Sequence, residues 1–218
     1  SCISQIVSPG VSIEIIVVCD ADDSCFAVAS TYSSQGVIAC NLVRHRGSYV
    51  AQNTGVSISS GDYITFCGAD DFMAPGRIRR MFSLMRRHGP MSLVNSLFCF
   101  VDSKGLKIED RGGWSAETGS ILGGVFMYSR AMFERLGGFR DWVCSADTEF
   151  IHRAKIAGAK FRVVQSKDYL YRKHGSQLTM NAETGSKSLL RLKYMESISS
   201  MIEAEHVEPQ VEEFILKV

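Results

Sequence analysis

Residues 61–75, GDYITFCGADDFMAP, decide how this chain folds. The apolar run at 63–67 is typical of a buried strand, and Gly68 interrupts it. Asp70 and Asp71 follow, and the proline after them is suited to the first turn of a helix. Acidic groups at the carboxyl end of a strand lie where α/β sheets bind ligands. Because adjacent carboxylates repel each other, the pair predicts a divalent cation held by oxygen ligands, with helix capping as the alternative.

The composition is that of a soluble globular domain. The 218 residues are 45% hydrophobic and 22% charged, and the net charge of +1 gives no sign of a nucleic-acid partner. No apolar run approaches the roughly 20 residues of a membrane helix, and Ser1 does not open a signal peptide. The seven cysteines contain no C-x-x-C pair, which is typical of small buried residues in a reducing compartment rather than of disulfides or a zinc site. We therefore expect a cytoplasmic protein, either free or peripheral to a membrane.

Strands and helices alternate, which predicts one α/β domain over residues 1–184 and a helical tail over 185–218. The predicted strands cover residues 13–18, 37–43, 63–67, 91–101, 121–128, 161–165 and 169–173, with a hairpin arm at 106–109. The predicted helices cover residues 22–35, 48–60, 75–88, 131–136, 146–157 and 185–205. Residues 110–119 are expected to form a loop over the site, and Trp114 and Trp142 either stack on a sugar or pack within the protein.

Two further carboxylates are candidates for binding and catalysis. Asp20 follows the first predicted strand, where it can accept a hydrogen bond from a uracil imide or a ribose hydroxyl, whereas Asp22 and Asp23 fit helix capping. Asp147 opens a predicted helix and could accept a proton from an attacking hydroxyl, with Glu149 as the second candidate. An acid that only complements the helix dipole is the alternative for Asp147.

The loop after the last predicted strand carries cations and an imidazole. His174 could be a third metal ligand beside Asp70 and Asp71, and Arg172 or Lys173 could face a phosphate. A solvated loop is the alternative reading of these residues.

Several segments in this order resemble glycosyltransferase family 2. The segments that carry the resemblance are residues 14–20, 51–55, 61–64 with 69–71 and Pro75, 124–127, 136–139, 147–150 with Arg153 and Gly158, and 171–174. The resemblance implies a GT-A-like fold, with a mostly parallel sheet flanked by helices and a C-terminal helix. It also implies a nucleotide-sugar donor, a divalent cation (Mn²⁺ or Mg²⁺) and inversion at the anomeric carbon. By the same resemblance Asp20 would contact the nucleotide base, Asp70 would bind metal and diphosphate, and Asp147 would be the catalytic base. Asn53, Arg172 and Lys173 are expected to be further donor contacts.

The prediction is therefore a metal-assisted, inverting glycosyltransferase of the hexosyltransferase type (EC 2.4 class). It would move a sugar from a UDP-sugar to a hydroxyl of a saccharide or other acceptor. A catalytically silent GT-A-like module that binds a nucleotide or a partner is the alternative, since Gly68, Gln52 and Ala146 stand where the family usually has charged residues. A nucleotidyltransferase would be expected to carry a glycine-rich phosphate loop after its first strand, and none is visible.

The beginning of the chain also departs from the family. Residues 1–5 resemble the helix that follows the family's first strand, so we expect that strand to be missing here. This pattern is compatible with three explanations: another segment supplies the strand, the parent chain is longer, or the chain is a diverged member that has replaced the strand. It is also compatible with a homo-oligomer.

Overall fold

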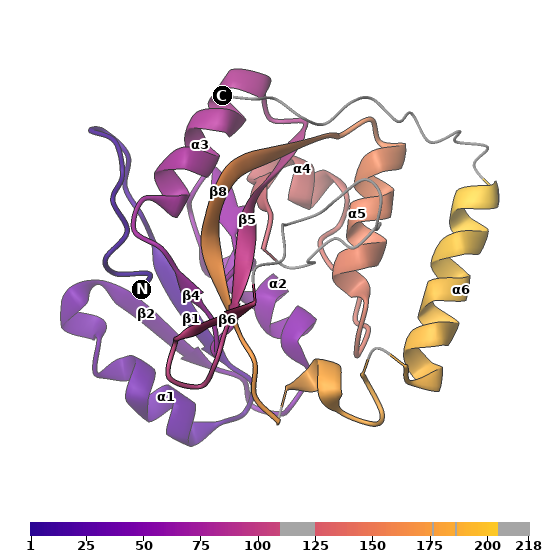
Figure 1. The fold of residues 1–218 in the computed structure, drawn as a ribbon, viewed down its shortest axis with the longest axis horizontal. Helices are drawn as coiled ribbons and strands as arrows, with labels where there is room; N and C mark the ends of the chain where they lie inside the picture. The colour runs from indigo at the N-terminus through magenta and orange to yellow at the C-terminus, as the bar shows by residue number, and fades with distance from the viewer. Residues whose placement is uncertain (110–124, 176, 186, 205–218) are drawn as a thin grey trace.

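The computed structural model describes residues 1–109, 125–175, 177–185 and 187–204, which form two sheets flanked by helices (Figure 1). The strands are β1 (Ile15–Cys19), β2 (Val37–Asn41), β3 (Tyr63–Thr65), β4 (Phe72–Met73), β5 (Ser92–Val101), β6 (Lys107–Glu109), β7 (Met127–Ser129) and β8 (Lys160–Arg172). The helices are α1 (Asp23–Ser30), η1 (Ser33–Gln35), α2 (Ser48–Ile58), α3 (Arg77–His88), α4 (Arg130–Arg135), α5 (Ala146–Ile156), η2 (Leu178–Met180) and α6 (Leu189–Ala204). None of these described helices is long and apolar enough to cross a bilayer.

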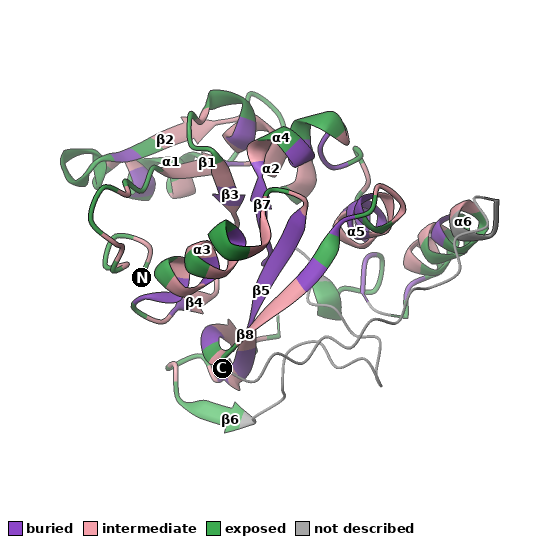
Figure 2. Cartoon of the chain, turned by 90° about the horizontal axis from the view of Figure 1, so that it is seen from above, coloured by how far each residue is buried: buried purple, intermediate pink, exposed green. Residues whose placement is uncertain are grey.

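The larger sheet is covered on both faces, and this explains its apolar strands. It runs in the order β3-β7-β5-β8-β4 with β6 paired to β5, and Figure 2 shows α3 on one side of β5 and β8 and α5 on the other. Neighbouring residues of β5 point to opposite faces. Leu93 packs in the cluster with Phe150 of α5, whereas Val94 packs with Met81 and Met85 of α3. The two cores therefore hold the sheet between the helices.

The pairing of the strands is mixed, not mostly parallel as expected. The pairs β1–β2 and β5–β8 are parallel, whereas β3–β7, β5–β7, β5–β6 and β4–β8 are antiparallel. The expectation of parallel strands came from continuous apolar runs, and such a run also fits an antiparallel strand that helices cover on both faces. Among the described strands β1 and β2 pair only with each other, so they form a separate two-stranded sheet.

Three predicted elements differ from the structure, and one lies partly outside the described residues. The helix expected over 22–35 divides into α1 and η1, because Thr31 and Tyr32 between them have low helix propensity. The two strands expected over 161–173 are one strand, whose pairing with β5 shifts register between Ser96 and Phe98 to accommodate the polar residues of β8. Residues 1–5 form a turn rather than a helix. Residues 121–124 of the strand expected over 121–128 lie outside the described residues, so only its end can be compared. The loop expected over 110–119, with Trp114, also lies outside them.

Candidate active site

The loop after β3 holds Asp71 against the end of β8. The Tyr169 hydroxyl donates to Asp71 Oδ2 at 2.6 Å, and the backbone N–H of Arg172 donates to Oδ1 at 2.9 Å. Burial raises the pKa of Asp71 above its usual value, and both hydrogen bonds oppose that rise. Each oxygen of this carboxylate thus already has a partner within the protein.

Asp70 is the more exposed carboxylate of the pair. Its Oδ2 lies 2.8 Å from Nε2 of His174, and the two side chains are 43% and 27% exposed respectively. The loop that follows β8 therefore places an imidazole beside Asp70, as the sequence predicts. A carboxylate oxygen and an imidazole nitrogen can both serve as ligands to Mn²⁺.

Gly68 lies directly beneath both carboxylates. A Cβ atom at this position would lie 2.7 Å from Asp71 Oδ2 and 3.0 Å from Asp70 Oδ1. A side chain here would press on Asp71 Oδ2, the oxygen that accepts from Tyr169. The absence of an acid at position 68 therefore agrees with the close approach of Asp70 and Asp71 to this glycine. The described residues contain no group of three or more His, Cys, Asp or Glu side chains arranged to hold a metal.

Two cations surround the end of β8. The guanidinium of Arg172 lies 4.3 Å from the centroid of the Phe72 ring, and Lys173 Nζ lies 4.0 Å from that of Phe100. The buried Nε of Arg172 has no hydrogen-bond partner within the described part of the chain. Because Arg172 also donates its backbone N–H to Asp71, the structure brings Arg172, Asp71, Asp70 and His174 into one cluster.

Asp20 organises the turn between β2 and α2. Its Oδ1 accepts from the backbone N–H of Arg46 at 2.7 Å, and its Oδ2 accepts from that of Gly47 at 2.7 Å. His45 Nδ1 lies 2.9 Å from the same Oδ2. Each carboxylate oxygen can accept more than one hydrogen bond, so these contacts leave acceptor capacity for a ligand. A donor contact by Asp20 stays a prediction.

A disulfide joins Cys19 and Cys25 across the turn that carries Asp20, with their Cα atoms 5.9 Å apart. The expectation that no cysteine forms a disulfide is wrong for this pair. Ala21 has a φ of 59° in this turn. The chain therefore folds back at Ala21 and brings Cys19 and Cys25 within bonding distance. Their spacing in the sequence matches no familiar cysteine motif.

Asp147 lies in the first turn of α5, half buried, and α2 contributes its partner. The Tyr49 hydroxyl donates to Asp147 Oδ1 at 2.7 Å. Burial and the nearby charge of Asp147 raise the pKa of Tyr49 far above its usual value, so the phenol stays a donor. This contact fixes Oδ1 of Asp147, whereas no group among the described residues donates a hydrogen bond to its Oδ2.

Glu149 cannot serve as the second candidate base. Its side chain is 0% exposed, and Arg140 and Arg153 both donate to Oε1, at 2.7 and 2.6 Å. Arg153 also donates to Oε2 at 2.7 Å and to the carbonyls of Leu136 and Gly138. Glu149 therefore links α5 to the turn after α4.

Asn53 of α2 binds the same turn. Its Nδ2 donates to the Phe139 carbonyl at 2.7 Å, and its Oδ1 accepts from the Phe139 N–H at 3.0 Å. Both ends of the amide are used by the protein, so the contact between Asn53 and a donor stays a prediction.

Three site residues have no signal in the sequence that would have identified them. Tyr49 and Tyr169 resemble ordinary core aromatics, and only the fold brings their hydroxyls to Asp147 and Asp71. Arg191 comes from α6 and donates to Ser145 Oγ at 3.3 Å, at the start of α5. The positive charge of Arg191 also lowers the pKa of Tyr49 and of Tyr171, opposing the rise that burial causes.

The sequence is similar to those of known glycosyltransferases. The profile of Glycosyl transferase family 2 matches residues 1–137. The uncharacterized glycosyltransferase YwdF of Bacillus subtilis (strain 168) is 41% identical over 68 residues, 31% of this chain and 25% of YwdF. The succinoglycan biosynthesis protein ExoO of Rhizobium meliloti (strain 1021) is 30% identical over 95 residues, 43% of this chain and 27% of ExoO. The chain thus matches about a quarter of the length of these curated relatives.

The fold resembles that of solved glycosyltransferase structures. The crystal structure of S. aureus TarS superposes with a TM-score of 0.71 at 14% identity, over 94% of this chain and 37% of TarS. TarS 1–349 in complex with UDP gives the same TM-score, over 94% of this chain and 60% of that one. These superpositions confirm the GT-A-like fold. Because the profile match also extends over more than half of the 218 residues, the chain belongs to glycosyltransferase family 2.

Proposed function

We propose that this protein is a glycosyltransferase that moves a hexosyl group from a UDP-sugar to a hydroxyl of a saccharide or other acceptor, with inversion. The observation that carries the proposal is the cluster at the end of β8, where the exposed Asp70 meets His174 beside Arg172. Family membership and the fold shared with TarS, which is described in complex with UDP, support the choice of donor.

The diphosphate of the sugar donor would bind at the end of β8. Arg172 offers a buried Nε that lacks a hydrogen-bond partner among the described residues, and Lys173 adds a second cation nearby. Guanidinium groups suit phosphate oxygens because their N–H donors match the geometry of the anion. The base and ribose would lie toward Asp20, with Asn53 holding the neighbouring turn.

The same cluster fits a divalent cation, Mn²⁺ or Mg²⁺. Asp70 and His174 would hold it, and Asp71, whose oxygens bind Tyr169 and Arg172, would orient the loop. Ions that dehydrate reluctantly are commonly bound by one or two protein groups together with substrate phosphates. When bound, such an ion stabilises the negative charge that develops on the departing diphosphate.

Asp147 would be the base. The acceptor oxygen forms a bond to the anomeric carbon, the bond from that carbon to the diphosphate oxygen breaks, and the acceptor proton passes to Asp147. Tyr49 holds Oδ1, so that Oδ2 is the oxygen that would receive the proton. Attack from the side opposite the leaving diphosphate gives inversion.

Calorimetric titration of UDP, with and without Mn²⁺, tests the donor site. Wild-type protein should bind UDP about tenfold more tightly with the ion, a difference of roughly 1.4 kcal/mol, and Asp70→Asn should abolish that gain. Asp62→Asn is the control, because Asp62 is exposed at the opposite end of β3. If UDP binds equally with and without metal in all three proteins, the metal role is wrong.

Turnover separates the enzyme from a silent binding module. Asp147→Asn should leave UDP affinity unchanged and lower UDP-sugar hydrolysis or transfer by roughly 10²- to 10⁴-fold. The silent module is favoured if wild-type protein binds UDP but its turnover equals that of Asp147→Asn. We further propose a cytoplasmic location, although a disulfide such as Cys19–Cys25 is rare in that compartment. Fractionation of the producing cells tests the location.

A further inference from the structure

Helix α3 concentrates positive charge in a chain whose net charge is only +1. It contains no acidic residue and carries five arginines and a histidine: Arg77, Arg79, Arg80, Arg86, Arg87 and His88. Arg77 is buried, and Arg80 forms an ion pair with Asp168 at 2.7 Å. The other three arginines are exposed, and no acidic group in the described ranges lies within ion-pair distance of them.

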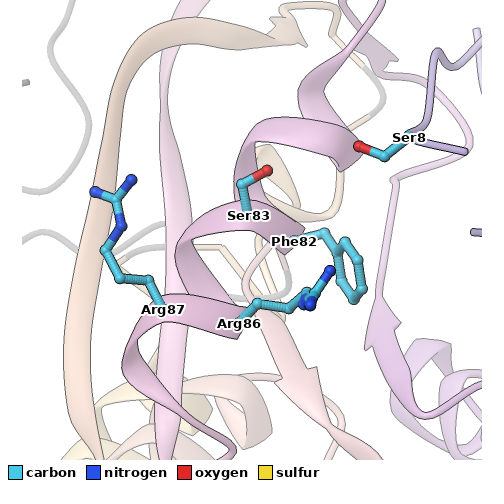
Figure 3. Close-up of a pocket in the computed structure, with 5 residues that line it drawn as sticks. All are labelled: Ser8, Phe82, Ser83, Arg86 and Arg87. Atoms are coloured by element: carbon cyan, nitrogen blue, oxygen red, sulfur yellow. The ribbon is translucent and has the colours of Figure 1, made fainter.

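The exposed arginines share one face of α3. Arg79, Ser83, Arg86 and Arg87 follow the i, i+4, i+7, i+8 spacing of a single helix face. Ser8, Phe82, Ser83, Arg86 and Arg87 line a surface pocket of about 340 Å³ (Figure 3). The Arg86 guanidinium lies 5.9 Å from the centroid of the Phe82 ring. Arg86 and Phe82 point to the side of Ser8, whereas Arg87 extends to the other side of the helix (Figure 3). The pocket thus presents the Arg86 guanidinium and two hydroxyl groups, which are suitable partners for phosphate oxygens, with Arg87 at its edge.

The positive field continues past the end of the helix. Burial and the charges of Arg162 on β8 and Arg87 together lower the pKa of His88. Cationic groups from two elements therefore crowd the same end of the molecule.

Exposed apolar residues border this charge. The N-terminal segment runs along α3, since Gln5 donates to the Ala74 carbonyl at 2.9 Å and accepts from the Ile78 N–H at 3.2 Å. Within the same segment Ile3 and Ile6 are 44% and 52% exposed. A basic helix face with neighbouring exposed aliphatic side chains is typical of proteins that bind the surface of an anionic membrane.

We propose that this α3 surface, formed by Arg79, Ser83, Arg86, Arg87 and Ser8 with Ile3 and Ile6 beside it, docks on a bilayer of anionic phospholipids. The arginines would contact headgroup phosphates and the isoleucines would enter the headgroup boundary. Arg79 and Arg87 are about 12 Å apart along the helix, which is too far for one free phosphate to reach both. A bilayer presents many phosphates at once, and it alone uses the isoleucines.

The part of the docking surface formed by Arg86 and Arg87 lies away from the candidate active site, whereas Arg79 and Ile3 lie nearer to it. Asp70 and Asp71 precede the N-terminus of α3, whereas Arg86 and Arg87 are in its last turn, about 14–15 Å along the helix from Arg77. Docking would leave the site open, and the inference does not depend on the proposed activity.

Co-sedimentation of the whole chain with vesicles tests the proposal. Wild-type protein should bind phosphatidylglycerol–phosphatidylcholine vesicles and not pure phosphatidylcholine vesicles. The variant Arg86→Gln/Arg87→Gln should bind about 25-fold more weakly, since each basic residue near an anionic surface contributes roughly 1 kcal/mol, or about fivefold. Ile6→Ser should weaken binding most at high salt, where the electrostatic contribution is screened.

The control variant Arg135→Gln/Lys193→Gln removes the same charge from exposed positions on α4 and α6 and should bind like wild type. A thermal melt verifies that each variant is folded, and Arg79→Gln provides a second variant if the double one is not. Equal binding to neutral vesicles, or equal loss in the control, would overturn the proposal. So would complete displacement by inorganic phosphate at constant ionic strength, which indicates a single anion site, or stronger binding to RNA than to the anionic vesicles.

Discussion

At the scale of single residues, one backbone turn gives two adjacent aspartates different environments. Asp71 turns toward Tyr169 and Arg172, whereas Asp70 stays exposed beside His174. The order of residues predicts that both follow a strand, but not which of them points inward. The same holds for Asp147 and Glu149 in the first turn of α5, since their spacing does not show that Arg140 and Arg153 bury Glu149.

The crowding above Gly68 gives the first prediction. Gly68→Ala would place a Cβ atom 2.7 Å from Asp71 Oδ2, which would have to shift and strain its hydrogen bond from Tyr169. We expect the free energy of unfolding to fall by roughly 1–3 kcal/mol in urea denaturation. Gly61→Ala is the control, because its Cβ would make only an ordinary contact at 3.6 Å. Equal stability of the two variants would mean that the carboxylate moves aside freely.

His152 gives a prediction of pH dependence. Burial and then the charge of Lys155 lower its pKa below the ordinary 6.5, so the folded state favours the neutral imidazole. Below pH 6.5 the unfolded state binds more protons at this residue, and its contribution to stability therefore rises with pH up to that value and is constant above it. Denaturation curves across acidic pH should show a shallower rise for His152→Gln. An unchanged slope would mean that other groups cause the rise.

At the scale of elements, the apolar patterns locate strands better than they define their ends or partners. The polar run within β8 suggests a loop, but register shifts against β5 keep the strand continuous. The mixed pairing of the larger sheet also has no local signal, because the direction of a strand depends on how the chain returns to it. The motif near β3 was informative because it combines a strand end, two acids and a helix start within a few residues.

The packing of α5 against the turn after α4 depends on Glu149. Replacing it with Gln leaves Arg153, whose side chain is 16% exposed, without its buried counter-charge. We expect Glu149→Gln to lower the free energy of unfolding by roughly 3 kcal/mol. Glu134→Gln breaks a partly exposed i,i+4 pair with Arg130 and should cost less than about 0.5 kcal/mol. A similar small loss in both variants would show that the buried carboxylate contributes little.

At the scale of the whole molecule, few contacts from the described residues attach α6. Figure 1 shows it outermost, beside α5, and far from the larger sheet. The ring of Tyr194 stacks on that of Trp142 with centroids 4.3 Å apart, Arg191 bonds Ser145, and Ile198 is buried. The division of the chain at residue 185 stays a prediction, but these contacts join the two proposed parts near the start of α5. The helix that carries Arg191 therefore lies over the region of Asp147.

This arrangement predicts that α6 opens as a unit without unfolding the rest of the chain. Tyr194→Ala removes a stacked pair worth about 1 kcal/mol, so amide hydrogens of α6 should exchange roughly fivefold faster. Tyr194→Phe keeps the ring and should exchange like wild type. Amides of β5 lie between the two cores and should be unaffected by either change. Faster exchange in β5 as well as α6 would mean that the helix belongs to the same cooperative unit as the sheet, and the tail would then be part of the domain.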